Sequence, residues 1–211
     1  MDGLVPEALA AFVLTSTVIE LTPGPNMAWL AIVAASEGRR PGYAAVAGVA
    51  IGLAVVGIAA ALGLAAAITA SPMLYQGLRW GGVLYLLWLA WDGWRDGDDG
   101  VDHMPAGARL RRYFRRGLIT NLLNPKAAVF YIAVLPGFTN PGGTVLVETI
   151  TLSLVYVAVA TAIHAAIVTL AGLARRILDD PRRSRIVRRV LSALLACIAL
   201  WFAWATGRAP L

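Results

Sequence analysis

Two charged residues lie inside long apolar segments of this 211-residue chain. Glu20 is in the first such segment, about residues 6–36, and Lys126 is in a later one, about residues 117–137. A charge at the centre of a bilayer costs several kcal/mol and normally faces a cavity or an opposite charge. A carboxylate and an amine held at that depth have the chemistry to bind the two ends of a zwitterion, and the carboxylate can also take up a proton.

The residue type of Lys126 is itself informative. It is the only lysine in the chain, since the other seventeen of the eighteen Lys and Arg residues are arginines. An ammonium is a compact charge that can lose its proton on burial, whereas a guanidinium is planar and permanently charged. This choice favours a binding role for Lys126. The alternative is a static ion pair between Glu20 and Lys126 that holds two helices together.

Prolines interrupt both apolar segments next to these charges. The first segment contains Leu21-Thr22-Pro23-Gly24-Pro25-Asn26, and the second contains Asn121-Leu122-Leu123-Asn124-Pro125-Lys126. Proline cannot donate a helical hydrogen bond and glycine adds backbone freedom, so both helices are expected to break there. In hydrocarbon, the freed backbone groups need other partners. The interpretation is a solute site, and the alternative is a proline kink whose freed groups are satisfied by neighbouring side chains.

The two sides of such a break attract opposite charges. N–H groups at the start of the helix near Asn26 suit a carboxylate, because that end of a helix is positive. The carbonyl groups near Ile19–Leu21, together with Glu20, suit an ammonium group. The predicted substrate-binding residues are Glu20, Pro23, Gly24, Pro25, Asn26, Asn121, Asn124, Pro125 and Lys126.

Three further residues are secondary candidates. Ser16 lies one helical turn before Glu20, and Tyr156 and His164 share one face of a later apolar segment at positions i and i+8. A lone histidine at that depth is interpreted either as a packing residue or as a proton relay. The chain has no recognisable catalytic motif, so no enzyme activity and no cofactor are expected.

Acidic residues cluster at one place, and the chain has a single thiol. The cluster lacks the spacing and the closing glutamate of a calcium loop, so we predict a solvated acidic loop and no metal site. It consists of Asp92, Asp96, Asp98, Asp99 and Asp102. Cys197 is the only cysteine, which excludes an internal disulfide and a thiol relay.

The elements that must position these residues are membrane-spanning helices. The chain is 59% hydrophobic and only 14% charged, and its mean hydropathy is +0.71. A helix crosses a bilayer with about 20 apolar residues. The sequence therefore predicts one all-α integral membrane domain, residues 1–211, with about six transmembrane helices. Their predicted ranges are about 6–36, 42–70, 73–92, 117–137, 146–174 and 190–207.

An internal repeat relates the two halves of the chain. With an offset of one hundred residues, Pro25 matches Pro125 and Pro41-Gly42 matches Pro141-Gly142. We predict two three-helix halves, about 1–95 and 110–211, joined by a soluble cytoplasmic loop at 93–116. A half with an odd number of spans reverses its orientation, so helices 1 and 4 are expected to be the broken helices of an inverted repeat.

Arginine placement predicts the orientation. The connections after predicted spans one, three and five hold fifteen arginines, and the opposite side holds only Arg79 and Arg208. By the positive-inside rule, both termini of this multi-pass protein are expected outside the cytoplasm. The net charge of +6 is therefore assigned to anionic lipid headgroups, and no nucleic-acid partner is expected.

Two further patterns concern packing. Gly48-x-x-x-Gly52 permits close approach of another helix, either within the chain or in a homodimer, and the pattern leaves both open. The third predicted span is rich in aromatic residues, which are typical of the membrane interface or of packing. They are Trp80, Tyr85, Trp88, Trp91 and Trp94.

Several of these segments, in this order and spacing, resemble the LysE/RhtB-type family of bacterial amino-acid exporters. The resemblance runs from about residue 8 to residue 142 and is carried by Leu21-Thr22-Pro23-Gly24-Pro25-Asn26, Glu37-Gly38-Arg39-Arg40-Pro41-Gly42, Gly48-Val49-Ala50-Ile51-Gly52, Trp80-Gly81-Gly82-Val83-Leu84-Tyr85-Leu86-Leu87-Trp88-Leu89 and Phe114-Arg115-Arg116-Gly117-Leu118-Ile119-Thr120-Asn121-Leu122-Leu123-Asn124-Pro125-Lys126-Ala127-Ala128.

This resemblance implies a secondary transporter of the bacterial inner (cytoplasmic) membrane that exports amino acids or close analogues from the cytoplasm, coupled to the proton gradient. The expected partners are a small amino-acid-like solute and the lipid bilayer. Two other functions stay open at the level of the sequence. One is a carrier for a metal ion or another small cation, and the other is a membrane assembly module without transport.

Overall fold

The computed structural model describes residues 6–22, 24–63, 71–95, 105–139, 145–174 and 181–206. All regular structure in these ranges is helical, which confirms the all-α prediction for the described residues. The elements are α1 (Pro6–Leu21), α2 (Pro25–Glu37), α3 (Arg39–Ala61), α5 (Pro72–Arg95), α6 (Ala106–Leu122), α7 (Pro125–Val129), a π-helix (Phe130–Val134), a 3-10 helix (Leu135–Phe138), α8 (Val145–Ala174) and α9 (Pro181–Thr206).

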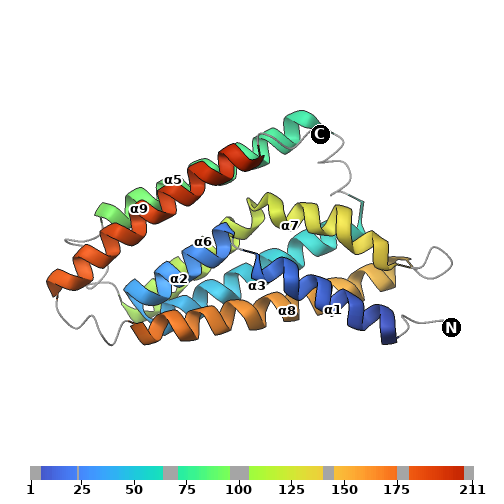
Figure 1. The fold of residues 1–211 in the computed structure, drawn as a ribbon, viewed down its shortest axis with the longest axis horizontal. Helices are drawn as coiled ribbons and strands as arrows, with labels where there is room; N and C mark the ends of the chain where they lie inside the picture. The colour runs from blue at the N-terminus through green and yellow to red at the C-terminus, as the bar shows by residue number, and fades with distance from the viewer. Residues whose placement is uncertain are drawn as a thin grey trace.

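The helices run back and forth along one long axis (Figure 1). Two of them, Arg39–Ala61 and Val145–Leu173, are long and apolar enough to cross a membrane alone. Two bent pairs also meet the requirement when each counts as one span, Pro6–Leu21 with Pro25–Glu37 and Ala106–Leu122 with Lys126–Phe138. Helices α5 and α9 lie side by side along one side of the molecule (Figure 1). The exact number of six spans and the superposition of the two halves stay predictions.

The segment predicted as a loop, 93–116, is helical at both of its described ends, so the loop prediction is wrong there. Helix α5 continues to Arg95, and helix α6 already begins at Ala106. The arginines of the segment 106–116 are compatible with a helix because several of them find partners on neighbouring helices. Arg109 Nη2 lies 2.6 Å from Glu37 Oε2, and Arg112 Nη2 lies 2.8 Å from Asp92 Oδ2.

Asp92 also differs from its predicted role. We expected it in a solvated acidic loop, but it lies in α5 and its carboxylate binds both Arg112 and Arg116 of α6. Two guanidinium groups on one carboxylate fix the end of α5 against α6, since charge-assisted hydrogen bonds are stronger than neutral ones. The other acidic residues of that cluster lie outside the described residues.

Glycines set the close packing of α3 against α6. A Cβ added at Gly48 would lie 2.0 Å from the carbonyl oxygen of Phe114, and one at Gly52 would lie 2.9 Å from Asn121 Cβ. Gly117 of α6 makes the reciprocal approach, 2.2 Å from Ala45 O. The Gly48-x-x-x-Gly52 motif therefore packs within the chain, where small residues let two helix backbones meet.

Replacement of Gly48 by Ala should destabilise the bundle. The new methyl group would meet the α6 backbone, which cannot rotate away as a flexible side chain can, and overpacking of this kind costs about 1–3 kcal/mol. The measurement is the thermal unfolding midpoint of the detergent-purified protein, followed by loss of the monodisperse peak in size-exclusion chromatography. We expect a lower midpoint for Gly48→Ala than for the wild type. Gly77→Ala is the matched control, because a Cβ at Gly77 meets nothing within 4 Å. Equal midpoints for the two variants would contradict the packing account.

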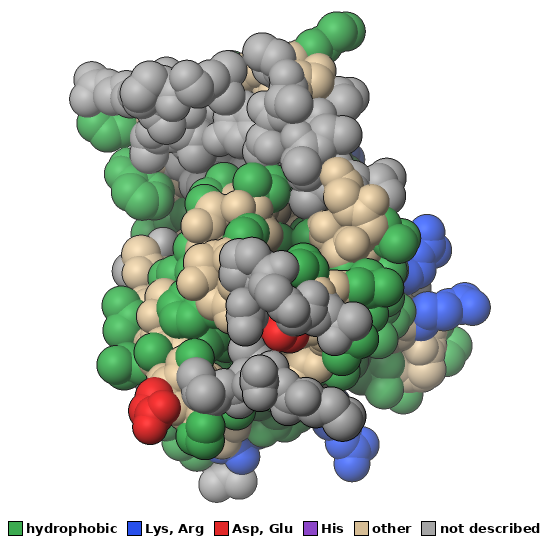
Figure 2. All heavy atoms as spheres, turned by 90° about the vertical axis from the view of Figure 1, so that its right-hand side faces the viewer, with side chains coloured by type: hydrophobic (Ala, Val, Ile, Leu, Met, Phe, Trp, Pro, Cys, Tyr) green, Lys and Arg blue, Asp and Glu red, His purple; other side chains and the backbone are tan. Residues whose placement is uncertain are grey.

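The outer surface of the bundle is apolar, as a lipid environment requires. Leu14, Leu84 and Leu154 are each more than 60% exposed on three different helices. Figure 2 looks onto the right-hand end of the molecule in Figure 1, where hydrophobic side chains dominate the described surface. A soluble protein rarely exposes such continuous apolar patches.

Candidate functional site

The first helix break separates α1 from α2 by a bend of 63°. Gly24 is extended, with φ −156° and ψ 171°, and Pro25 occupies the first helical position of α2, where its missing N–H costs nothing. The N–H of Ala28 donates to Gly24 O, so the amides of Asn26 and Met27 precede the first hydrogen bond of this helix. Pro23, a predicted site residue, lies outside the described residues.

The second break separates α6 from the helical turns that follow by a bend of 51°. Asn124 caps the new helix, because its Oδ1 accepts a hydrogen bond from the Lys126 amide at 3.1 Å. Pro125 takes the first helical position, as Pro25 does in α2. The two prolines, which are one hundred residues apart in the sequence, thus occupy the same position at the start of a helix.

A π-helix follows this second break at Phe130–Val134 and passes directly into a 3-10 helix at Leu135–Phe138. Pro136 explains the irregularity, since it has no N–H for the carbonyl of Ile132 and its ring would clash with that carbonyl in an α-helix. The wide turn places the ring of Phe130 on that of Tyr156, with centroids 3.7 Å apart and planes within 12°. Neither the π-helix nor this stacking was predicted from the sequence.

The two breaks meet in the structure. Asn26 Nδ2 donates to Asn121 Oδ1 at 2.8 Å, and Lys126 Nζ donates to Thr22 O at 3.0 Å. Each contact joins a residue of one break to a residue of the other, at sequence separations of 95 and 104 residues. The Lys126 ammonium lies at the carboxyl end of α1, where the helix dipole is negative and carbonyl groups lack helical partners.

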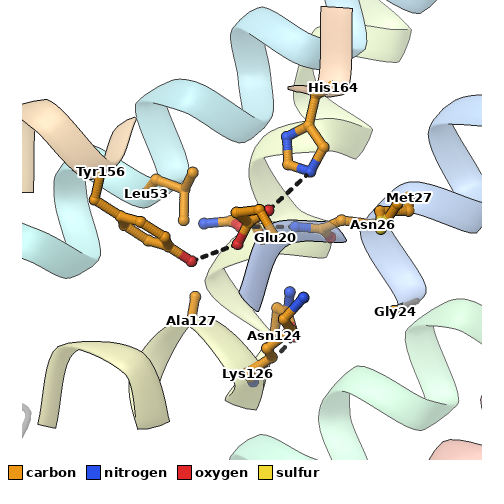
Figure 3. A pocket seen from close by; sticks show the side chains of 11 residues that line it. Glu20, Gly24, Asn26, Met27, Leu53, Asn124, Lys126, Ala127, Tyr156 and His164 are labelled. Carbon is orange, nitrogen blue, oxygen red and sulfur yellow. Dashed lines mark hydrogen bonds and ion pairs between the residues drawn. The ribbon is translucent and has the colours of Figure 1, made fainter. Parts of the chain in front are cut away.

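Glu20 lies beside this junction, only 5% exposed, and is held by helix α8. Tyr156 Oη donates to Glu20 Oε1 at 2.5 Å, and His164 Nε2 lies 3.3 Å from Glu20 Oε2 (Figure 3). Tyr156 and His164 reach the same carboxylate because positions i and i+8 fall on one helix face. Two of the three secondary candidates, Tyr156 and His164, therefore contact Glu20 directly.

The direct Glu20–Lys126 ion pair that one interpretation assumed does not form in this structure. Both residues belong to the part of the chain that the structure describes, yet Glu20 contacts Tyr156 and His164, and Lys126 binds a backbone carbonyl. The two charges face the same cavity from different sides (Figure 3). A static pair that ties two helices together is therefore not their arrangement here.

Several buried polar atoms at the junction have no hydrogen-bond partner among the described protein atoms. They include an acceptor, Asn26 Oδ1, and a donor, Asn121 Nδ2, on the two amides that bind each other. His164 Nδ1 and Ser16 Oγ are also buried and have no hydrogen-bond partner among the described protein atoms. Buried polar groups are normally satisfied, so this cluster is suited to a polar ligand that supplies the missing partners.

The cavity at the junction is small, with room for about one water molecule. The residues that line it are Glu20, Gly24, Asn26, Met27, Leu53, Asn121, Asn124, Lys126, Ala127, Tyr156 and His164. A molecule as large as an amino acid does not fit a space of this size unless the surrounding helices separate. The two breaks are the natural hinges, because backbone there is not held by helical hydrogen bonds.

Most predicted site residues come together in this cavity, and three lie beside it. Ser16 is buried one turn away on α1, Pro25 is buried at the start of α2, and the backbone of Pro125 begins α7. Sequence reasoning missed the apolar wall formed by Met27, Leu53 and Ala127, because apolar residues carry no signal in an apolar chain. It also missed Tyr131, whose hydroxyl donates to Leu53 O at 3.0 Å.

Comparison with known proteins gives a consistent result. Residues 17–206 match the family described as LysE type translocator. A homoserine/homoserine lactone efflux protein of Salmonella typhimurium is 28% identical over 89% of this chain and 92% of its own length. A leucine efflux protein of Klebsiella pneumoniae is 33% identical over 68% and 71%, and an uncharacterized membrane protein of Pseudomonas aeruginosa is 35% identical over 68% and 72%. No solved structure matches the chain.

Proposed function

This chain belongs to the LysE type translocator family, and on that premise we propose that it exports an amino acid or a close analogue from the cytoplasm, driven by the proton gradient. The family consists of transporters and not of enzymes. The proposed solute site is the cavity where the two helix breaks meet. The observation that carries this proposal is the convergence of a carboxylate, an ammonium and two carboxamides with unsatisfied atoms in one buried place.

The charges of the site fit a zwitterion. Glu20 would receive the ammonium group of the solute, and Lys126 would bind its carboxylate together with the free Asn121 Nδ2 and the amides at the start of α2. Lys126 donates one of its three N–H groups to Thr22 O, so the other two are left to bind the solute carboxylate. The Lys126 charge therefore has a partner both before and after the solute binds.

Proton coupling requires a group that loses the solute and gains a proton in the same step. Glu20 meets this description, because a buried carboxylate without a cation is more stable in its protonated form. His164 lies within 3.3 Å and provides a second titratable group between the carboxylate and helix α8. We assign the coupling proton to this pair, with Tyr156 holding the carboxylate in place through its hydroxyl.

The names of the relatives supply a solute panel for the test. Purified protein is reconstituted in proteoliposomes, and transport of labelled leucine, homoserine and homoserine lactone is measured with and without a pH gradient. We expect concentrative transport of at least one of these solutes that collapses with a protonophore. Orientation is read with an impermeant thiol reagent on a Gly97→Cys, Cys197→Ala protein, whose new thiol is expected on the cytoplasmic side.

The outcomes of this test separate the proposed function from its alternatives. Transport of a divalent cation in place of every amino acid would favour a metal carrier. Binding of none of these solutes by folded, correctly oriented protein would contradict the proposal and leave a membrane assembly module. Labelling of Gly97→Cys from outside intact cells would overturn the predicted orientation.

A further inference from the structure

A second cavity, unlike the first in chemistry, lies between α5 and α6 at the arginine-rich end of the bundle. Its volume is about 410 Å³, and it is lined chiefly by Arg111, Arg112, Arg115, Arg116, Tyr85 and Trp88. All four arginines lie on α6 at i, i+1, i+4 and i+5, so one side of that helix faces the cavity. The proposed transport mechanism uses none of these residues.

Positive charge exceeds negative charge in this cavity. The described residues that line it include four arginines and no carboxylate. Asp92, next to the cavity, binds two of these arginines, Arg112 and Arg116. Arg111 and Arg115 are exposed and form no ion pair with any carboxylate that the structure describes. Asp92 therefore binds Arg112 and Arg116, and Arg111 and Arg115 can bind an external anion.

The aromatic wall of the cavity continues onto a surface typical of a membrane interface. Trp88, Trp91 and Trp94 follow one another along α5 and are 47%, 60% and 45% exposed. Each has a guanidinium group over its ring, from Arg116 at 5.2 Å, Arg95 at 5.7 Å and Arg189 at 5.6 Å, respectively. Tryptophan rings concentrate at the level of lipid headgroups, and arginines beside them face phosphate.

We propose that this cavity binds the phosphate headgroup of an anionic phospholipid. Guanidinium groups bind phosphate oxygens in a bidentate way, and Arg111 and Arg115 have no carboxylate partner within the described part of the chain. The lipid chains would run along Trp88 and Ile119, which form the apolar part of the wall. This wall favours a lipid over a free phosphate ion, because a free ion gains nothing from apolar contact. Basic pockets between transmembrane helices are typical headgroup sites.

The test measures lipid binding directly and needs no transport. Detergent-purified protein is titrated with phosphatidylglycerol or with phosphatidylcholine of the same acyl chains, and bound lipid is counted by native mass spectrometry. Wild-type protein should retain phosphatidylglycerol preferentially. Arg111→Gln/Arg115→Gln should bind it about 30-fold more weakly, since each arginine near a headgroup contributes about fivefold.

The control removes the same charge elsewhere. Arg40 is exposed and does not line this cavity, so Arg40→Gln should keep nearly wild-type binding, whereas Arg115→Gln should bind phosphatidylglycerol about fivefold more weakly. Equal loss in these two single variants would overturn the proposal in favour of a nonspecific charge effect. Equal retention of the two lipids by wild-type protein would overturn it without any variant. Displacement of phosphatidylglycerol by millimolar inorganic phosphate alone would also contradict it, because the site would then be a free-anion site.

Discussion

The Glu20→Gln protein is expected to reach the membrane, fold and transport its solute about 10- to 100-fold more slowly than the wild type. The amide has the size of the carboxylate and can still accept the Tyr156 hydroxyl, which donates at 2.5 Å. It cannot carry the negative charge that would receive an ammonium group, and a hydrogen bond to a charged group contributes about 1.5–3 kcal/mol. It also cannot bind the coupling proton, so any residual transport should no longer respond to a pH gradient.

The measurement is efflux from preloaded cells, normalised to the amount of protein in the membrane, followed by transport in proteoliposomes at two pH gradients. Tyr156→Phe is the matched control. It removes the hydroxyl but keeps the ring that stacks on Phe130, so it should reduce the rate less and leave the gradient dependence intact. Gradient-dependent transport at the wild-type rate by Glu20→Gln would show that the carboxylate neither binds the solute nor carries the proton.

The second large effect is expected at Lys126. Lys126→Met keeps the length of the side chain and removes its charge, so solutes with a carboxylate should lose about 10- to 100-fold in transport rate. Homoserine lactone has an ammonium group but no carboxylate, and its transport should suffer less. Lys126→Arg should also be impaired, because a broad planar cation does not fit a cavity with room for about one water molecule.

Arg40→Met provides the control for general loss of positive charge, because Arg40 is exposed at the start of α3, away from the junction. Each variant is compared with wild type for the same solute, at equal membrane levels. Full efflux of a carboxylate-bearing solute by Lys126→Met would rule out the proposed role of Lys126. Equal losses of transport rate for homoserine and its lactone would show that Lys126 has a structural role, through its hydrogen bond to Thr22 O, and does not bind the solute carboxylate.

The sequence alone was sufficient to locate the broken helices and the charges beside them. Proline chemistry is local, because a missing N–H and a fixed φ break a helix whatever surrounds it. Both Pro25 and Pro125 begin new helices as predicted. A charge inside an apolar run is equally visible in one dimension, since its desolvation cost depends on depth and not on a particular neighbour. For this reason Glu20 and Lys126 could be singled out before any contact was known.

The partners of these residues were decided by the tertiary structure. Lys126 binds Thr22 O and not Glu20, while Glu20 is bound by Tyr156 and His164. The Gly48 motif packs on α6, and the arginine-rich segment before predicted span four is helical. The membrane-spanning helices are apolar on nearly every face, so their hydrophobic pattern does not show which face is turned inward. Helix packing therefore decides which side chains meet. In a membrane this packing depends on close backbone approach at glycines and on a few hydrogen bonds between helices, and not on the burial of apolar faces away from water.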